Sequence, residues 1–298
     1  MMRASLLVIL LGISLSATAG GAGRTLTVAA YNLCNLFDTI NDPGIADDVP
    51  TPEAYRFKIE ALARVIGELG ADVVGLCEVE NAAVLHDLIA AVPLDGDVSY
   101  RFVHYESPDR RGIDVALLYR ADRLRPVASE PIRAPESYPT RDVLRAEFAM
   151  DGTDRRLVFY VLHLPSRRGG HGQADRMRQM IAASVGELVA GEASGTGVVV
   201  LGDLNDIPTA GWMRRTLAAE ETGLRNLTVA PHRRGVGSYA WRDAWLMYDH
   251  ILVNGDVNPI GEVRVFRRPW MLTPSGRFRG YPDRRISDHL PVYVRVAY

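Results

Sequence analysis

The sequence predicts an α/β protein in which two β-sheets pack face to face and helices cover them from outside. Strand and helix patterns alternate at both ends of the chain, and a run of strand patterns occupies the middle. The hydrophobic share of 47% is ample for a large core. No repeat, low-complexity tract or Pro/Ser-rich linker interrupts residues 20–298, which we therefore expect to form one domain.

The first third of the chain alternates strand and helix. An apolar strand is expected over residues 26–32, followed by a helix over 52–69, where apolar residues recur every three or four positions. A continuous apolar run over 72–78 is typical of a buried strand. A second helix is expected over 82–91.

The middle and the last third are richer in strands. Short runs of β-branched and aromatic residues between turn residues predict strands over 100–105, 113–119, 124–131, 143–150 and 157–162. A long helix over 173–190 precedes an apolar strand over 198–201. Three further strands are expected over 249–254, 263–266 and 292–296.

Residues 1–19 have the form of a secretory signal peptide. Met1 to Arg3 give a positive start, Leu6 to Leu15 an apolar run, and Ala17-Thr18-Ala19 a small-residue cleavage site. About ten apolar residues are too few to span a bilayer, and no later segment approaches about 18. No Cys follows the run, so lipoprotein anchoring is not indicated. Cleavage after Ala19 leaves 279 of the 298 residues, and we expect this mature chain to be secreted or periplasmic.

The net charge does not indicate a protein that binds polyanions. The net charge is −2, whereas binders of nucleic acid are often strongly basic. Lys58 is the one lysine beside 33 arginines, a ratio typical of a GC-rich genome, so the abundance of Arg is weak evidence for nucleic acid.

The two cysteines leave a disulfide open. Cys34 and Cys77 each lie beside a polar motif, and export permits a bridge. Both also lie in apolar strand-end surroundings, where buried free thiols are common.

Polar residues stand at the ends of the apolar strands. Taken singly, each has an ordinary interpretation as a turn, a helix cap or a hydrogen-bonded His. Strand ends on one rim of a sheet can, however, converge in a single crevice. The residues so placed are Asn32, Glu78, His163, Asp203, Asn205, Asp249, Asp288 and His289.

Seven segments in this order resemble the motif set of the endonuclease/exonuclease/phosphatase superfamily. They are Asn-Leu-Cys-Asn-Leu-Phe-Asp, Gly-Leu-Cys-Glu-Val-Glu-Asn, Arg-Gly-Ile-Asp-Val-Ala, His-Leu-Pro-Ser, Gly-Asp-Leu-Asn-Asp, Tyr-Asp-His-Ile and Ser-Asp-His-Leu-Pro-Val. The resemblance covers residues 27–294 and implies a four-layer α/β/β/α sandwich of two packed mixed sheets with outer helices. It implies a secreted bacterial, deoxyribonuclease-like phosphodiesterase.

The resemblance also implies a metal site for Mg²⁺, with Mn²⁺ or Ca²⁺ as alternatives. Glu78 resembles the metal-binding Glu of the family, with Asn32 and Asp288 as further or water-mediated ligands. Such hard cations prefer oxygen ligands and keep several waters. The chain has no CxxC or HExxH pattern, so zinc is not favoured.

Acid–base roles follow from the same resemblance. His289 resembles the general base, with Asp249 orienting its ring. His163 matches the position of a second His that protonates the leaving oxygen, and Asp114 that of its carboxylate partner.

Other residues are expected to hold the substrate. Asp203 and Asn205 would hold the nucleophile or the scissile phosphate. Arg141 resembles a phosphate-contacting Arg, and Arg110, Arg111 and Arg167 are further candidates.

Two features concern the substrate. Where pancreatic deoxyribonuclease carries an Arg that enters the minor groove, this chain has Glu80, and a carboxylate there would repel DNA phosphates. The sequence also shows no obvious exposed aromatic hairpin. The four Trp are expected in the core or in a pocket wall, at positions Trp212, Trp241, Trp245 and Trp270.

Three functions remain open. A secreted, monomeric endonuclease acting on DNA or RNA is favoured. The alternatives are a phosphatase or phospholipase C-like hydrolase of inositol phosphates or lipid headgroups, and a catalytically inactive binding relative.

Overall fold

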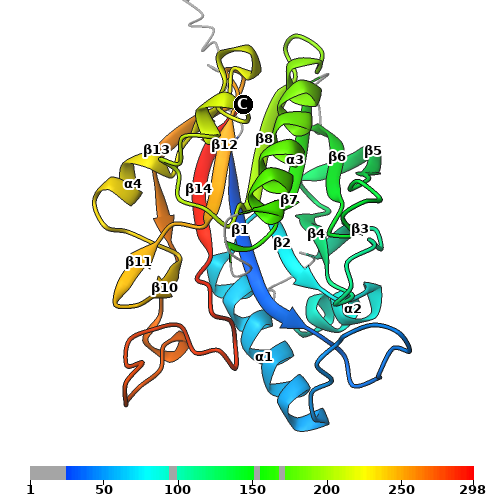
Figure 1. The fold of residues 1–298 in the computed structure, drawn as a ribbon, viewed down its shortest axis with the longest axis vertical. Coiled ribbons are helices and arrows are strands. Elements are labelled where there is room, and N and C mark those ends of the chain that lie inside the picture. The colour runs from blue at the N-terminus through cyan, green and yellow to red at the C-terminus, as the bar shows by residue number, and fades with distance from the viewer. Residues whose placement is uncertain (1–24, 94–98, 151–154, 168–171) are drawn as a thin grey trace, which may run out of the picture.

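The computed structural model describes residues 25–93, 99–150, 155–167 and 172–298 (Figure 1). The expected signal peptide at residues 1–19 lies outside these ranges. The described strands form two six-stranded sheets and one two-stranded sheet.

The first sheet has the strand order β13-β14-β1-β2-β4-β3. Its central strand β1 runs parallel to β2 and antiparallel to β14, so the sheet is mixed. Its strands are β1 (Thr25–Leu36), β2 (Val73–Val79), β3 (Tyr100–His104), β4 (Asp114–Arg120), β13 (Asn258–Val265) and β14 (Val292–Ala297).

The second sheet has the order β5-β6-β7-β8-β12-β9 and is also mixed, because β7 and β8 are parallel while β8 and β12 are antiparallel. Its strands are β5 (Leu124–Ile132), β6 (Val143–Met150), β7 (Arg156–His163), β8 (Gly197–Asp203), β9 (Arg225–Asn226) and β12 (Asp249–Val253). A separate hairpin consists of β10 (Tyr239–Trp241) and β11 (Ala244–Leu246).

The helices α1 (Pro52–Leu69), α2 (Ala82–Ala91) and α3 (Gln173–Ala190) confirm the three helices predicted from periodicity. The side chain of Thr51 caps α1 by accepting a hydrogen bond from the Ala54 backbone N–H at 3.2 Å. Gly70 ends α1 in the left-handed conformation, at φ 59°. Shorter helical segments are α4 (Val229–Arg233) and three 3₁₀ turns, at Met213–Arg215, Glu220–Thr222 and Pro269–Met271.

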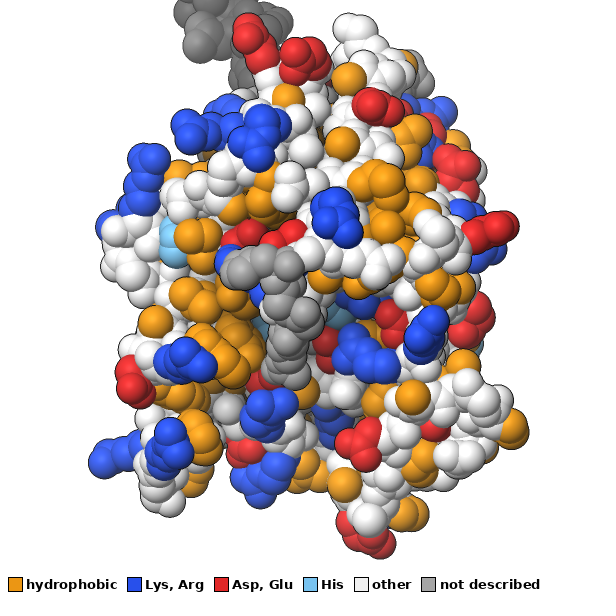
Figure 2. All heavy atoms as spheres, in the orientation of Figure 1, with side chains coloured by type: hydrophobic (Ala, Val, Ile, Leu, Met, Phe, Trp, Pro, Cys, Tyr) orange, Lys and Arg blue, Asp and Glu red, His pale blue; other side chains and the backbone are white. Residues whose placement is uncertain are grey.

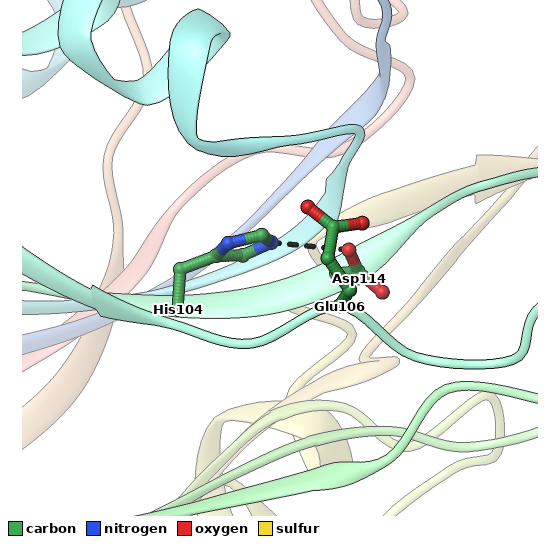
Figure 3. Close-up of side chains that lie close together, drawn as sticks. All are labelled: His104, Glu106 and Asp114. Carbon is green, nitrogen blue, oxygen red and sulfur yellow. Dashed lines mark hydrogen bonds and ion pairs between the residues drawn. The ribbon is translucent and has the colours of Figure 1, made fainter. Parts of the chain in front are cut away.

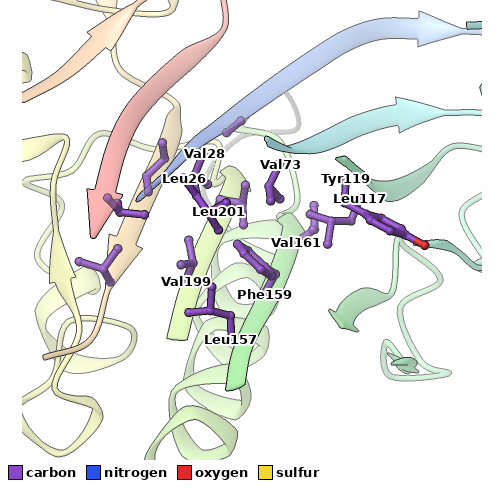
Figure 4. Close-up of a cluster of buried hydrophobic side chains, with 14 of the residues drawn as sticks. Leu26, Val28, Val73, Leu117, Tyr119, Leu157, Phe159, Val161, Val199 and Leu201 are labelled. Carbon is purple, nitrogen blue, oxygen red and sulfur yellow. The ribbon is translucent and has the colours of Figure 1, made fainter. Parts of the chain in front are cut away.

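Three apolar clusters separate four layers, as the sequence predicts. The central cluster joins the inner faces of the two sheets, with Val73 and Leu117 from one sheet and Phe159 and Leu201 from the other (Figure 4). A second cluster lies between the first sheet and α1 and α2, and a third lies between the second sheet and α3. The order is therefore helices, sheet, sheet, helix.

Gly75 allows the two sheets to approach closely in the middle of β2. A Cβ atom at this position would lie 2.7 Å from Cδ1 of Leu201 in the facing sheet. Glycine is therefore required here by the packing of one sheet on the other.

Both cysteines are free thiols, which closes the question that the sequence leaves open. Cys77 lies in the central core, and its Sγ is 3.4 Å from the backbone carbonyl oxygen of Leu162. In the described part of the chain, no helix is long and apolar enough to cross a membrane.

Candidate active site

The strand directions bring the polar strand ends together at one rim of both sheets. Asn32 and Glu78 lie near the carboxyl ends of the parallel strands β1 and β2, and His163 and Asp203 end β7 and β8. Asp249 begins the antiparallel strand β12 directly opposite Asp203. A hydrogen bond joins the two sheets at this rim: the Asn32 side-chain amide donates to Asp203 Oδ2 at 3.0 Å.

Asp203 Oδ2 is the centre of the site. The Nε2 atoms of His163 and His289 lie 3.7 Å and 3.8 Å from it. The backbone N–H of Asn205 donates to the other carboxylate oxygen of Asp203 at 2.8 Å. Burial raises the pKa of Asp203 to about 7, against the opposing effect of the positive charge of His289.

Glu78 reaches the site through an irregularity in β2. The pairing register of β2 shifts at this position against both β1 and β4, and Glu78 has a left-handed backbone at φ 64°. Such a bulge redirects one side chain, and a non-glycine residue with positive φ is costly unless its surroundings hold it. Here the backbone N–H of Asn35 donates to Glu78 Oε2 at 2.8 Å.

Gly202 is fixed by the backbone beside Asp203. Its φ of 131° is unfavourable for residues with a side chain, and a Cβ would lie 2.0 Å from the carbonyl oxygen of Leu162. The Gly in the Gly-Asp-Leu-Asn-Asp segment therefore lets β8 end tightly against β7.

His289 and Asp249 form a buried pair. His289 Nδ1 lies 2.6 Å from Asp249 Oδ2, and Asp249 has no exposed surface. Burial alone would lower the pKa of His289. The carboxylate of Asp249, helped by those of Asp203 and Asp288, outweighs burial and holds the pKa of His289 well above its usual range.

The charges around His163 have the opposite sign to those around His289. Its side chain is buried, and its Nδ1 has no hydrogen-bond partner among the described residues. Burial, together with the positive charges of Arg141 and Arg111, holds the pKa of His163 well below its usual range. The site therefore favours a charged His289 and a neutral His163, the reverse of the states that an acid His163 and a base His289 require.

Asp114 does not pair with His163, so that part of the sequence interpretation is wrong. Its Oδ2 lies 3.0 Å from Nε2 of His104, and its Oδ1 accepts from the Ser107 backbone N–H at 2.9 Å and from the Ser107 hydroxyl (Figure 3). Asp114 thus holds the 104–107 turn beside the site. Together with Glu106, these two residues form the only group of three His, Cys, Asp or Glu in the described chain with ligand atoms within 4.8 Å of one another.

The two best-matched arginines differ in access. Arg141 is only 7% exposed, and its guanidinium donates to Asp109 Oδ2 at 3.0 Å and to the Leu164 carbonyl at 2.9 Å. The side chain of Arg111 is 42% exposed, and its Nη2 lies 3.9 Å from Glu78 Oε1. Arg111 is therefore the arginine better placed to meet a substrate phosphate, whereas Arg141 supports the site from beneath.

Comparison with known proteins agrees with this geometry. The sequence profile of the Endonuclease/Exonuclease/phosphatase family matches residues 27–298. The chain belongs to this family. Members are hydrolases of phosphate and phosphodiester bonds, and they typically depend on a divalent metal ion.

Solved structures with the same fold share little sequence with this family member. A humanised TDP2 from D. rerio has a TM-score of 0.65 and 19% identity, covering 92% of this chain and 99% of that one. The human Nocturnin catalytic domain with bound sulfate has a TM-score of 0.61 and 17% identity, covering 92% of this chain and 94% of that one. A mannosyl-6-phosphatase from Bacteroides thetaiotaomicron has a TM-score of 0.62 and 18% identity, covering 92% of this chain and 100% of that one. No curated protein matches the sequence.

The oxygen donors at the rim fit the divalent ion that family enzymes use. Glu78 Oε1 accepts no hydrogen bond from the described residues. The described His and Arg nitrogens within 4.0 Å of it are His163 Nε2 at 3.7 Å and Arg111 Nη2 at 3.9 Å. Asp288 borders the same site, because its Oδ1 lies 4.0 Å from His289 Nε2, which is itself 3.8 Å from Asp203 Oδ2. Asn32 Oδ1 is already engaged by the Cys34 backbone N–H, so Asn32 suits a water-mediated role.

Two residues of the site were not among the candidates chosen from the sequence. The ring of Tyr239 lies 4.8 Å from that of His289, and the two residues form an isolated β-bridge. The Ser287 hydroxyl donates to the Asn32 carbonyl and accepts from the His289 backbone N–H. Ser287 could have been found as the neighbour of Asp288 and His289 in their motif. Tyr239 could not, since tertiary structure alone brings it to His289.

Glu80 does not face the substrate. Its side chain is only 4% exposed, and its Oε2 accepts a hydrogen bond from the Asp38 backbone N–H at 2.5 Å. The expected repulsion between this carboxylate and DNA phosphates is therefore wrong, because Glu80 lies beneath the 38–48 loop.

Proposed function

We propose that this family member is a divalent-metal-dependent phosphodiesterase that cleaves DNA or RNA as an endonuclease after export from the cell. The observation that carries the proposal is the buried His289–Asp249 pair, set beside Asp203 and across the rim from Glu78. The retained acid–base and carboxylate groups also argue against an inactive binding relative.

In this proposal Glu78 and Asp288 hold a divalent cation, with Asn32 supporting it through water. The cation supplies neutralisation of the negative charge on the phosphoryl oxygens. Asp203 and Asn205 hold the attacking water and the scissile phosphate next to each other. Two hydrogen bonds from Asn205 to the Asp203 carboxylate fix the positions of both side chains for this role.

His289 Nε2 accepts the proton of the attacking water as the new P–O bond forms. Asp249 keeps Nδ1 protonated and stabilises the imidazolium that results. Because only the neutral ring accepts a proton, activity is expected to rise with pH. As the bond between phosphorus and the leaving oxygen breaks, a neutral His163 suits a hydrogen bond from its Nε2–H to that oxygen, which then takes its proton from solvent water.

Exposed aromatic and arginine side chains beside the site favour a nucleic acid substrate. Trp241 lies at the end of β10 and is 48% exposed, which corrects the expectation that it lies in the core or a pocket wall. Tyr239, which contacts His289, lies two residues earlier, so both rings are on the same face of β10. Tyr239 is buried and stacks on Tyr248, so Trp241 is the ring of this strand that offers a face to a base, while arginines pair with the phosphates.

The segment that follows β13 adds positive charge. Residues 267–285 contain six Arg and one Asp, a net charge of +5 in a chain of net −2. Phe278 in this segment is 56% exposed, and Tyr281 joins it to the hairpin through a hydrogen bond to Asp243 at 2.9 Å. Figure 2 shows Arg and hydrophobic side chains side by side at the lower left, where β10, β11 and this segment lie in Figure 1.

A substrate panel tests the proposal. Single-stranded DNA, duplex DNA, RNA, inositol phosphates, a sugar phosphate and sphingomyelin vesicles are compared with and without EDTA. We expect metal-dependent cleavage of nucleic acid. Hydrolysis of only a phosphomonoester or a lipid headgroup would leave the reaction class intact and refute the nuclease.

Trp241→Ala tests the binding surface, with Val127→Ala as control because Val127 is an exposed residue on the edge strand β5. Loss of one stacked base costs about 1–3 kcal/mol, which corresponds to an increase in KM of about 5- to 150-fold. A small nitrophenyl phosphodiester should be cleaved as before. Equal effects on both substrates would contradict a role in binding the nucleic acid strand.

A further inference from the structure

The His289–Asp249 pair is built from both sheets. Asp249 begins β12 of the second sheet, whereas His289 lies shortly before β14 of the first. The hydrogen bonds within either sheet therefore do not set the separation of 2.6 Å between His289 Nδ1 and Asp249 Oδ2. A contact that reaches both segments is needed to hold the pair together.

Ser238 contacts both segments. It is fully buried and lies immediately before the β10–β11 hairpin. Its hydroxyl oxygen accepts hydrogen bonds from the Asp249 backbone N–H at 3.3 Å and from the Tyr248 backbone N–H at 3.4 Å. Its carbonyl oxygen accepts from the Leu290 backbone N–H, next to His289, at 2.8 Å. One residue thus ties the backbone that carries Asp249 to the backbone that carries His289.

The residues around Ser238 fix its own position. Its backbone N–H donates to the Leu246 carbonyl at 2.9 Å, which attaches it to β11. Tyr239, the next residue, forms the β-bridge with His289. A Cβ on Gly237 would lie 2.5 Å from the Leu246 backbone nitrogen, so this close approach to β11 requires glycine. Residues 237–239 therefore form a fixed support beside the pair.

We propose that Ser238 is a positioning residue for the His289–Asp249 pair, and that its two contacts hold the ring and the carboxylate at hydrogen-bond distance. The inference rests on the proposed function for what the pair does, while the positioning is a property of the fold. Loss of the hydroxyl would leave two backbone N–H groups without their acceptor, so the start of β12 would shift to find another. A misplacement of about 1 Å in a catalytic group can cost about a hundredfold in rate.

Ser238→Ala removes only the hydroxyl. With a nitrophenyl phosphodiester, kcat should fall by up to about a hundredfold, whereas KM should stay close to that of the wild type because Ser238 is buried and does not reach the substrate. Thr222→Val is the matched control. Its hydroxyl is also buried and accepts a backbone N–H, that of Leu224 at 3.1 Å, but it lies beside α3. It should lower Tm as Ser238→Ala does and leave kcat unchanged.

A double-mutant cycle with Asp249→Asn separates positioning from general damage to the fold. If Ser238 acts through the pair, its substitution should matter much less once Asp249 has lost its charge, because residues that act as a unit do not contribute additively. In the Asp249→Asn background, Ser238→Ala should therefore change kcat by no more than about twofold. The full loss of kcat in both backgrounds would overturn the inference.

Proton NMR tests the positioning without any substrate. A ring proton held in a short hydrogen bond to a buried carboxylate resonates far downfield. We expect this Nδ1 proton resonance of His289 in the wild type and in Thr222→Val, and a shift toward the ordinary His range in Ser238→Ala and Asp249→Asn. This pattern in a protein that cleaves no phosphodiester would refute the proposed function and support the positioning.

Two results would overturn the positioning whatever the activity. One is a wild type without the downfield resonance, and the other is a resonance that stays in place in Ser238→Ala. If Ser238→Ala fails to fold, Ser238→Cys replaces it, because a thiol has similar size and accepts hydrogen bonds only weakly. Ser238→Cys should give a smaller shift in the same direction, and no shift would count against Ser238 in the same way.

Discussion

Replacing Asp249 by Asn should preserve the fold and remove most of the catalytic rate. Asp249 is fully buried, and its Oδ2 lies 2.6 Å from His289 Nδ1. Asn has the same shape and can still accept the hydrogen bond from Nδ1. What it lacks is the negative charge that stabilises the imidazolium formed when His289 takes a proton.

The size of the effect follows from the geometry. With the hydrogen-bonded atoms at 2.6 Å, the centres of charge lie about 4 Å apart, and at an effective dielectric constant of about 20 their attraction is about 4 kcal/mol. Both groups are buried, so solvent screens this attraction little. At about 1.4 kcal/mol per tenfold change, kcat should fall about a thousandfold, and the pKa of His289 should fall as well.

The sign of the pH dependence is fixed by the same charge. Asp249 raises the pKa of His289, and the base acts only when neutral, so the wild-type rate should rise with pH through this elevated pKa. In Asp249→Asn the rise should move to lower pH while the plateau falls. The assay is kcat/KM against pH for a nitrophenyl phosphodiester in Mg²⁺, with circular dichroism to check folding. A rise that stays in place, or that moves to higher pH, would refute the pairing.

Three further predictions test separate parts of the structure. Glu78→Gln should lower kcat by orders of magnitude and leave Tm unchanged. EDTA should abolish wild-type activity until Mg²⁺ is restored, and full activity in EDTA would refute the metal hypothesis. His163→Ala should slow cleavage of DNA more than that of a nitrophenyl diester, whose leaving group needs no hydrogen bond, without removing an ionisation from the pH profile. Gly75→Val should lower the free energy of unfolding by about 1–3 kcal/mol through its clash with Leu201, and Leu201→Ala in the same chain should restore part of it.

The sequence could predict the helices and the convergence of the site because both depend on local patterns. Apolar spacing and a Thr–Pro start define α1, and the strand-end positions of Glu78, Asp203 and Asp249 follow from apolar runs that stop at a polar residue. The short strands β9, β10 and β11 were missed. They contain only two or three residues each, too few for a period to be recognised.

The partners of Asp114 and Glu80 could not be predicted from their positions. Asp114 meets His104 because the 104–107 turn folds back on it, which no spacing in the chain specifies. In a regular strand, Glu78 and Glu80 would point to the same face, since side chains alternate with a period of two. The shift of register at Glu78 breaks that alternation, so Glu78 enters the site while Glu80 is buried under the 38–48 loop.

The charge states of the two His residues depend on all the charges around them, which motif matching does not take into account. Three carboxylates, Asp203, Asp249 and Asp288, act on His289, whereas Arg141 and Arg111 act on His163. Each influence depends on distance and burial in the folded chain. Burial, with a smaller contribution from the charge of Asp249, raises the pKa of Asp203 to about 7. A divalent cation held beside these residues would offset the carboxylates that keep His289 protonated, so the cation and a deprotonated base would stabilise each other.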